Sequence, residues 1–218
     1  MRSLIVPMAG RSSRFPNMRP KWMLTHPMTN RFMVTESILG LNLDFFDNIW
    51  FICLQEHEDK YQFMKGLVSE LDEVGLRAKS NIVLLPEQTD SQSETVYTFL
   101  SGQELEGFVF IKDSDGFYRC DVEERNQVAY FDLNDMDDIN ARTKSYIELD
   151  VNNVITNIVE KKVVSSTFSS GGYGFADAKE FCKTFEKLQD MDGECYISHI
   201  IFEMMLSGST FYGTKTTD

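Results

Sequence analysis

The stretch LIVPMAGRSSRFPNMRPKWML, from Leu4 to Leu24, decides how the chain is interpreted. Its first residues, Leu4 to Val6, form an apolar run that is too short for a helix and is followed by turn-forming residues, which predicts a buried strand. A loop of small residues follows, and small residues let backbone N–H groups approach a ligand closely. Because successive N–H groups in a turn form a concave anion site, the strand and its loop predict that the chain binds an anion.

The same stretch concentrates positive charge on an acidic protein. Within eleven residues of a chain whose net charge is −13 stand four cations, Arg11, Arg14, Arg19 and Lys21. Local positive charge on so acidic a protein indicates a bound polyanion, and a nucleoside triphosphate is the obvious candidate. The alternative is a solvated strand-to-loop turn with ordinary surface arginines.

The composition is that of an ordinary globular protein and argues against several classes of function. The chain has 218 residues, of which 42% are hydrophobic and 25% charged, and this suits one domain, or one with a subdomain. No apolar run approaches the roughly 20 residues of a membrane span, and no secretory signal is recognisable. The negative charge argues against a nucleic-acid partner. Four scattered cysteines are expected to be reduced thiols, so we expect a cytoplasmic protein without a membrane partner.

Predicted strands and helices alternate along the first half of the chain. Apolar runs predict strands at Asn48 to Leu54, Asn81 to Leu85 and Leu105 to Lys112. Apolar residues three and four apart predict helices at Asn30 to Leu43 and Gln55 to Gly75, and a third helix is expected at Ser93 to Ser101. This alternation predicts an α/β fold with a Rossmann-like, mixed but mainly parallel sheet flanked by helices. In such sheets, ligands bind beyond the carboxyl ends of the strands.

The second half of the chain is less regular. Tyr118 to Asp138 is acidic and loosely patterned, and its segment Asp135 to Asp138 is interpreted as a solvated loop rather than a metal site. Tyr146 to Glu160 predicts a strand, a turn and a second strand, and Phe168 to Ala176 predicts a further strand. Helical periodicity returns twice, at Asp177 to Leu188 and at Glu194 to Leu206.

Two carboxylates follow the strand that ends at Lys112. Asp113 and Asp115 would supply the hard oxygen ligands that a magnesium–triphosphate complex needs. The same Asp-Ser-Asp-Gly sequence is also consistent with side chains that merely cap a turn. The three histidines and the cysteines form no zinc or triad pattern, which favours direct displacement over a covalent enzyme intermediate.

The order of these motifs resembles the nucleotidyltransferase family that makes activated sugars and phospho-alcohols. In that family, the first strand ends in a Gly-rich loop followed by Arg, and a Pro-Lys pair comes soon after. Here the loop is matched by Gly10, Ser12, Ser13 and Arg14, although Ser12 stands where many members have Gly, and the pair is matched by Pro20-Lys21. The resemblance implies a GT-A-like fold and catalytic roles for Arg14 and Lys21, which would neutralise the triphosphate and the developing pyrophosphate. It implies nucleotide binding by Met8, Ala9, Gly10, Arg11, Ser12 and Ser13.

The resemblance extends over nearly the whole chain. It implies that Gln88 reads a base edge and that Ser93 offers a helix N-terminus to a phosphate, whereas a polar loop with an N-cap is the simpler alternative. It implies a Mg²⁺ site at the strand end, where Asp115 matches the family's metal-binding Asp better than Asp113 does. Family members continue to a further strand that ends in a second metal-binding Asp, so we expect that this chain, which ends at Asp218, is incomplete at its C-terminus.

Four residues resemble the acceptor-binding positions of the family. Glu160 and Lys161 match a Glu-Lys pair whose Glu bonds acceptor hydroxyls and whose Lys meets the acceptor phosphate. Gly172 matches a backbone contact to the acceptor, and Glu194 matches a helix-opening residue that contacts its hydroxyls. Lys162 stands where sugar-1-phosphate members usually carry Pro, so a sugar 1-phosphate and a small phospho-alcohol both remain open as acceptors.

We therefore expect one domain, residues 1–218, with an NTP-binding half at 1–117 and an acceptor-binding half at 118–218. The expected enzyme transfers a nucleoside monophosphate from an NTP to a phosphorylated acceptor with release of pyrophosphate, for surface polysaccharide precursors such as those of a capsule. The alternatives are a GT-A-type glycosyltransferase that uses an NDP-sugar and a catalytically idle nucleotide-binding subunit. The oligomeric state stays open.

Overall fold

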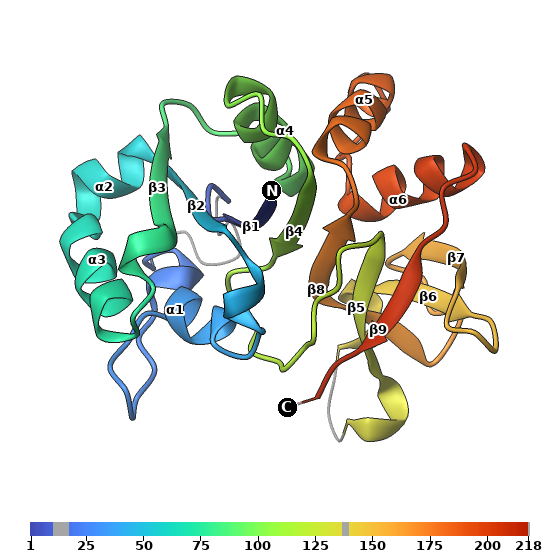
Figure 1. Ribbon diagram of the computed structural model, residues 1–218, viewed down its shortest axis with the longest axis horizontal. Helices are drawn as coiled ribbons and strands as arrows, with labels where there is room; N and C mark the ends of the chain where they lie inside the picture. The colour runs from blue at the N-terminus through green and yellow to red at the C-terminus, as the bar shows by residue number, and fades with distance from the viewer. Residues whose placement is uncertain (11–17, 137–139, 218) are drawn as a thin grey trace.

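A nine-stranded mixed sheet organises the part of the chain that the computed structural model describes, which is residues 1–10, 18–136 and 140–217. The strand order is β3-β2-β1-β4-β8-β5-β9, and β6 pairs with β7 and β8 beside this path (Figure 1). The strands are β1 (Arg2–Pro7), β2 (Asn48–Leu54), β3 (Ser80–Leu85), β4 (Phe108–Lys112), β5 (Gln127–Asp132), β6 (Ser145–Leu149), β7 (Ile155–Glu160), β8 (Thr167–Phe175) and β9 (Tyr212–Lys215).

The sheet confirms the predicted Rossmann-like α/β class. β1 pairs in parallel with β2 and β4, and β2 pairs in parallel with β3. β8 runs antiparallel to both β4 and β5, so it joins this parallel half to the second half, where β9 pairs in parallel with β5. The carboxyl ends of β1, β3 and β4 therefore meet at one edge of the sheet, the edge at which such folds bind ligands.

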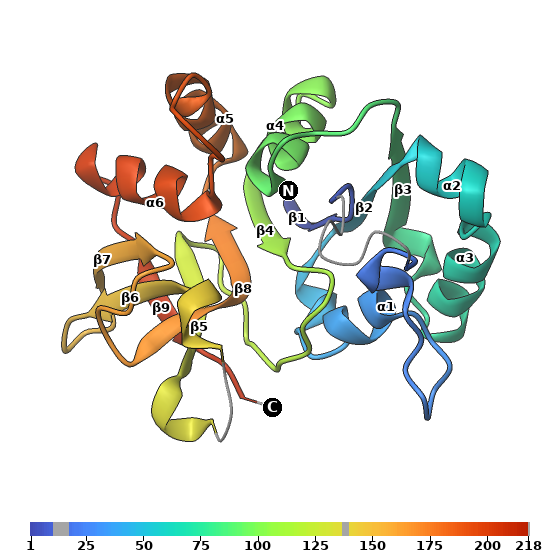
Figure 2. The ribbon, with the colours of Figure 1, turned by 180° about the vertical axis from the view of Figure 1, so that it is seen from behind.

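Six α-helices of the described residues cover the two faces of the sheet. α4, α5 and α6 lie together, apart from α1, α2 and α3, in both views (Figures 1 and 2). No helix among the described residues is both long and apolar enough to cross a membrane. The bounds are α1 (Met33–Ile38), α2 (Gln55–Tyr61), α3 (Met64–Glu73), α4 (Gln92–Gly102), α5 (Ala178–Leu188) and α6 (Ile197–Leu206).

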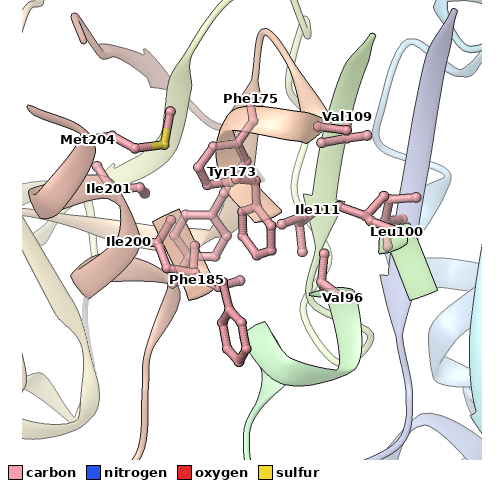
Figure 3. Close-up of a cluster of buried hydrophobic side chains, with 14 of the residues drawn as sticks. Val96, Leu100, Val109, Ile111, Tyr173, Phe175, Phe185, Ile200, Ile201 and Met204 are labelled. Atoms are coloured by element: carbon pink, nitrogen blue, oxygen red, sulfur yellow. The ribbon is translucent and has the colours of Figure 1, made fainter. Parts of the chain in front are cut away.

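The side chains of β1 alternate between the two faces of the sheet, and each face is covered by its own layer of helices. Leu4 and Val6 point into one apolar cluster with α1 and α3, whereas Ile5 points into the other cluster with α4, α5 and α6. In this second cluster, side chains of α4, α5 and α6 gather around Ile111 of β4 and Tyr173 of β8 (Figure 3). The second cluster therefore spans both halves of the sheet.

Two predicted helices differ from the structure. The prediction of one helix from Gln55 to Gly75 is wrong, because Gln62 adopts a left-handed conformation with φ 51° and ends α2. The carboxylate of Glu58 then accepts the N–H of Met64 at 3.0 Å, at the start of α3. The helix expected from Asn30 to Leu43 is shorter, since Asn30 also has positive φ and helical structure is confined to α1 and a short 3-10 turn, Leu43–Phe45.

Strand β5 lies inside the segment that the sequence leaves unpatterned. Four consecutive residues, Gln127 to Tyr130, are buried, because neighbouring elements cover both faces of this strand. Gln127 is satisfied by polar partners: its Oε1 accepts the hydroxyl of Thr214 at 2.9 Å, and its Nε2 donates to the carbonyl of Glu123 at 2.5 Å. After β5, Asp135 is exposed and pairs with Lys215 at 2.9 Å, which agrees with the predicted solvated loop. Asp137 and Asp138 lie outside the described residues.

Candidate active site

Two neighbouring cavities open at the carboxyl edge of the parallel strands. The first has a volume of about 480 Å³ and is lined by the residues after β1, the loop before α4 and the residues after β4. The second, of about 440 Å³, lies between the residues after β4, the β6–β7 hairpin, β8 and the start of α6. The cavities share one wall, which consists of Lys21, Gln92, Asp113 and Asp115.

The end of β1 forms the floor of the first cavity. The N–H of Met8 donates to the carbonyl of Ile52 at 2.8 Å, and the buried indole of Trp22 donates to the carbonyl of Met8 at 3.1 Å. Trp22 is fixed in turn against the edge of Phe63, with ring centroids 4.8 Å apart. Three of the predicted nucleotide-binding residues, Met8, Ala9 and Gly10, line this cavity.

Four predicted residues, Arg11, Ser12, Ser13 and Arg14, lie outside the described residues.

The helix start beside the first cavity lies at Ser91, not at Ser93. The hydroxyl of Ser91 accepts the N–H of Glu94 at 3.1 Å, caps α4 and lines the cavity. Ser93 is fully buried and donates to the carbonyl of Cys195, so the prediction that it offers a helix N-terminus to a phosphate is corrected. Gln88 is not among the residues that line either cavity, although its neighbour Thr89 lines the first.

Lys21 and Asp115 meet in the shared wall. The Nζ atom of Lys21 lies 3.2 Å from Oδ2 of Asp115, and both side chains remain more than a third exposed. Lys21 belongs to a short 3-10 helix, Lys21–Met23, which follows Pro20. The buried Trp22 in this helix hydrogen-bonds the carbonyl of Met8 and so fixes the helix beside the end of β1. The predicted catalytic cation and the predicted metal-binding carboxylate are therefore in contact.

Asp113 occupies a more enclosed position than Asp115. Its Oδ1 accepts a hydrogen bond from Nε2 of Gln92 at 2.6 Å. Burial raises the pKa of the Asp113 carboxyl to about 6, although the Gln92 hydrogen bond opposes this shift. Gly171 makes room for the carboxylate: it has φ +87°, and a Cβ there would lie 2.3 Å from Oδ2 of Asp113.

A buried lysine holds the loop that carries both carboxylates. The side chain of Lys112 is fully buried and donates to the carbonyls of Asp113 at 2.7 Å and Gly116 at 2.6 Å. Its ammonium group also lies 4.4 Å from the ring centroid of Tyr118. Burial lowers the pKa of Lys112 to about 8.

Glu160 is the centre of a hydrogen-bond network in the second cavity. Its Oε2 accepts hydroxyl hydrogen bonds from Ser145 at 2.5 Å and from Ser198 at 2.7 Å. The three residues come from β7, β6 and α6, and all three line the second cavity. The predicted acceptor residue Glu160 thus lines the same cavity as Asp113 and Asp115.

The other three predicted acceptor residues lie elsewhere. Gly172 faces the interior, where a Cβ would lie 2.1 Å from the hydroxyl oxygen of Tyr118, and its neighbour Gly171 lines the second cavity instead. Glu194 lines the first cavity rather than the second. Lys161 lines neither cavity, because its ammonium group is turned onto the ring and hydroxyl of Tyr196.

Solved structures resemble this chain over nearly its whole length, although no family model and no curated protein matches the sequence. The nucleoside-diphosphate-sugar pyrophosphorylase from Vibrio cholerae RC9 matches with a TM-score of 0.75 at 17% identity, over 99% of this chain and 91% of that one. The chain has the nucleotidyltransferase fold. The inositol-1-phosphate CTP transferase from T. maritima matches with a TM-score of 0.73 at 12% identity, over 99% of this chain and 85% of that one. A UDP-glucose pyrophosphorylase, solved with UDP-glucose, matches with a TM-score of 0.71 at 13% identity, over 100% of this chain and 92% of that one.

Within this nucleotidyltransferase fold, the structure adds residues that the sequence does not single out. Ser91 has a local signal, since Ser91-Gln92-Ser93-Glu94 has the Ser-x-x-Glu spacing of a helix start. Gln92, Ser145 and Ser198 have no such signal: they reach the carboxylates of Asp113 and Glu160 from 15 to 38 residues away along the chain. Only folding brings these residues to the cavities.

The donor set of the shared wall suits a magnesium ion. Asp113 and Asp115 offer carboxylate oxygens, and Mg²⁺ in nucleotide sites uses one or two carboxylates, with phosphates and water completing its shell. Among the described residues, no group of three or more His, Cys, Asp or Glu side chains is arranged to hold a metal without such help.

Proposed function

We propose that this chain transfers a nucleoside monophosphate from an NTP to a phosphorylated acceptor and releases pyrophosphate. The observation that carries the proposal is the wall of Lys21, Gln92, Asp113 and Asp115 that the two cavities have in common. A nucleotide in the first cavity and an acceptor in the second would meet at this wall, which holds one cation and two carboxylates. The fold, which the chain shares with pyrophosphorylases and nucleotidyltransferases, agrees with this arrangement.

The reaction needs positioning and charge neutralisation rather than a protein nucleophile. An oxygen of the acceptor phosphate attacks the α-phosphorus and forms a new P–O bond. The bond between the α-phosphorus and its bridging oxygen breaks, and pyrophosphate leaves with the electron pair. Lys21 stabilises negative charge at this wall, and the backbone after β1 together with the Ser91 start of α4 holds the nucleotide.

Asp113 and Asp115 would hold the Mg²⁺ that accompanies the triphosphate. When bound, Mg²⁺ supplies positive charge that offsets the charge on the phosphates. The ion pair with Lys21 keeps the Asp115 carboxylate at the cavity surface, and Gln92 holds Asp113 through one oxygen. Arg11, Ser12, Ser13 and Arg14 remain proposed partners of the triphosphate, and Gln88 remains a proposed reader of the base.

The acceptor is proposed to carry both hydroxyls and a phosphate. Glu160 already accepts two hydroxyl hydrogen bonds, from Ser145 and Ser198, and would exchange or add acceptor hydroxyls at its carboxylate. A sugar 1-phosphate and a phosphorylated polyol both fit this chemistry. Synthesis of surface polysaccharide precursors in the cytoplasm is the setting that we propose for it.

The test is the release of pyrophosphate from each of the four NTPs, with Mg²⁺, in the presence of glucose 1-phosphate, inositol 1-phosphate or phosphocholine. We expect release with at least one pair and none without an acceptor. Sugar transfer from UDP-glucose without pyrophosphate would instead show a glycosyltransferase. Nucleotide binding without either reaction would show an idle nucleotide-binding subunit.

A further inference from the structure

Two lysines, Lys144 and Lys161, are candidates for the cation that binds the acceptor phosphate. Lys144 and Lys161 are neighbours across the β6–β7 hairpin, where the N–H of Lys161 donates to the carbonyl of Lys144 at 2.9 Å. Their side chains nevertheless have different surroundings: Lys144 lines the second cavity and Lys161 does not. A phosphate in that cavity therefore meets one of them directly.

The side chain of Lys161 is held against Tyr196, and its Nζ atom also lies 4.0 Å from Oε1 of Glu160. Its Nζ atom lies 3.9 Å from the ring centroid of Tyr196 and hydrogen-bonds the hydroxyl group of the same residue. The backbone of Lys161 has φ +53°, outside the extended conformation of a strand, which breaks the alternation that follows Glu160. Tyr196 itself lines the cavity, whereas Lys161 does not.

The side chain of Lys144 lines the second cavity, as Glu160 does. It is half-buried, its Nζ atom lies 5.7 Å from the ring centroid of Phe168, and no described carboxylate forms an ion pair with it. Two residues of the shared wall, Asp113 and Asp115, line this cavity too.

We infer that Lys144, rather than Lys161, is the cation that binds the phosphate group of the acceptor. This inference rests on the proposed function and names the phosphate subsite of its second substrate. An acceptor with hydroxyls on Glu160 and a phosphate on Lys144 would lie in the second cavity, whose lining includes the wall shared with the nucleotide cavity. Tyr196 then forms part of the cavity lining, and Lys161, held on the ring and hydroxyl of Tyr196, does not contact the phosphate directly.

The kinetic test compares Lys144→Ala with Lys161→Ala, and it uses the exposed Lys162→Ala as a matched control. For whichever of glucose 1-phosphate or inositol 1-phosphate is turned over, we expect Lys144→Ala to raise the acceptor KM about tenfold or more, because it removes a charge-assisted contact. The KM for NTP should stay unchanged, Lys144→Arg should restore much of the loss, and Lys161→Ala should have a smaller effect. An equal or larger rise in Lys161→Ala would overturn the inference.

A binding test separates this inference from the proposed function. Inorganic phosphate is titrated into the full chain and followed by calorimetry, with Lys21→Ala as a further variant for the wall that both cavities share. We expect Lys144→Ala to weaken phosphate binding at least tenfold and Lys161→Ala to weaken it less. If phosphate binding depends on Lys144 but no NTP releases pyrophosphate, the subsite stands and the proposed transfer fails.

The converse results are equally informative. If transfer occurs with an acceptor KM that is independent of Lys144, the proposed function stands and the inference fails. The inference is also overturned if wild-type protein does not bind millimolar phosphate, or if only Lys21→Ala reduces the binding.

Discussion

Asp113 and Asp115 stand two residues apart, yet their carboxylates have different environments. Asp113 is enclosed by Gln92 and Gly171, and its pKa is raised to about 6, whereas Asp115 remains exposed beside Lys21. The chain gives no local sign of this difference, since both residues belong to the same Asp-Ser-Asp segment. The residues that enclose Asp113 come from α4 and β8, and only the fold brings them together.

Replacing Lys21 with Ala should lower turnover about 100-fold or more, because it removes a cation at the place where pyrophosphate charge develops. The melting temperature should change little, since its ion pair with Asp115 is exposed and such pairs contribute at most about 1 kcal/mol. Steady-state pyrophosphate release and calorimetric melting measure the two effects. Lys65→Ala, on the exposed side of α3, is the control, and near-normal turnover of the Lys21 variant would remove Lys21 from the mechanism.

Asp115→Asn should weaken the Mg²⁺-dependent part of NTP binding more than Asp113→Asn does. The reason is that Asp115 presents an exposed, charged carboxylate, whereas Asp113 already gives one oxygen to Gln92. Calorimetric titration of NTP with Mg²⁺ and with EDTA isolates the metal-dependent part. Equal losses in the two variants would assign the metal to both carboxylates alike.

Gly171→Ala should destabilise the protein by roughly 1–3 kcal/mol and displace Asp113, because Gly171 has positive φ and no room for a Cβ beside that carboxylate. Gly102→Ala is the matched control, since nothing lies within 4 Å of its added Cβ and its φ is not positive. Urea unfolding of the two variants measures the difference. Equal stabilities would show that Asp113 moves aside without cost.

At the scale of the elements, apolar patterning predicts the parallel strands but not all of their partners. β2 has the predicted bounds, and the hairpin of β6 and β7 lies where two strands and a turn are expected. β5 escapes prediction because it is buried on both faces and carries Gln127 inside the core, so it lacks the alternation of a half-exposed strand. The break between α2 and α3 depends on the left-handed conformation of Gln62, and the sequence does not predict it because neither Gly nor Pro stands at this position.

The start of α4 can be tested against the start of α5. Ser91 and Asp177 both cap their helices through side-chain oxygens, but only Ser91 lines a cavity. Ser91→Ala and Asp177→Ala should each cost about 1 kcal/mol of unfolding free energy, because each leaves a helix N–H without its partner. Only Ser91→Ala should also weaken NTP binding, measured by calorimetry, and similar binding by both variants would place the nucleotide away from α4.

At the scale of the whole molecule, β8 unites the two halves. It pairs with β4 on one side and β5 on the other, and the apolar cluster around Ile111 and Tyr173 includes helices from both halves (Figure 3). Separating the two halves would expose that cluster, and both halves would lose apolar packing. We therefore interpret residues 1–117 and 118–218 as two functional halves of one cooperative unit.

Asp113 should also make the stability of the molecule depend on pH. Its pKa is raised from 3.8 to about 6 on folding, so the folded state holds this proton more tightly than the unfolded state does. The contribution favours folding below pH 4 and is lost as the pH rises to about 6, which amounts to roughly 3 kcal/mol at most. Asp113→Asn should remove this part of the pH dependence in metal-free urea unfolding between pH 4 and 7. An unchanged slope would show that Asp113 titrates normally in the folded protein.

The wall shared by the two cavities has a consequence for the end of the reaction. In the proposed reaction, the nucleotide and the acceptor become one molecule, and this molecule would occupy both cavities at once. Covalent linkage of two ligands raises the affinity of the whole above that of either part. The product is therefore expected to inhibit its own synthesis by competing with both substrates. Product release, rather than the chemical step, would then limit the rate of turnover.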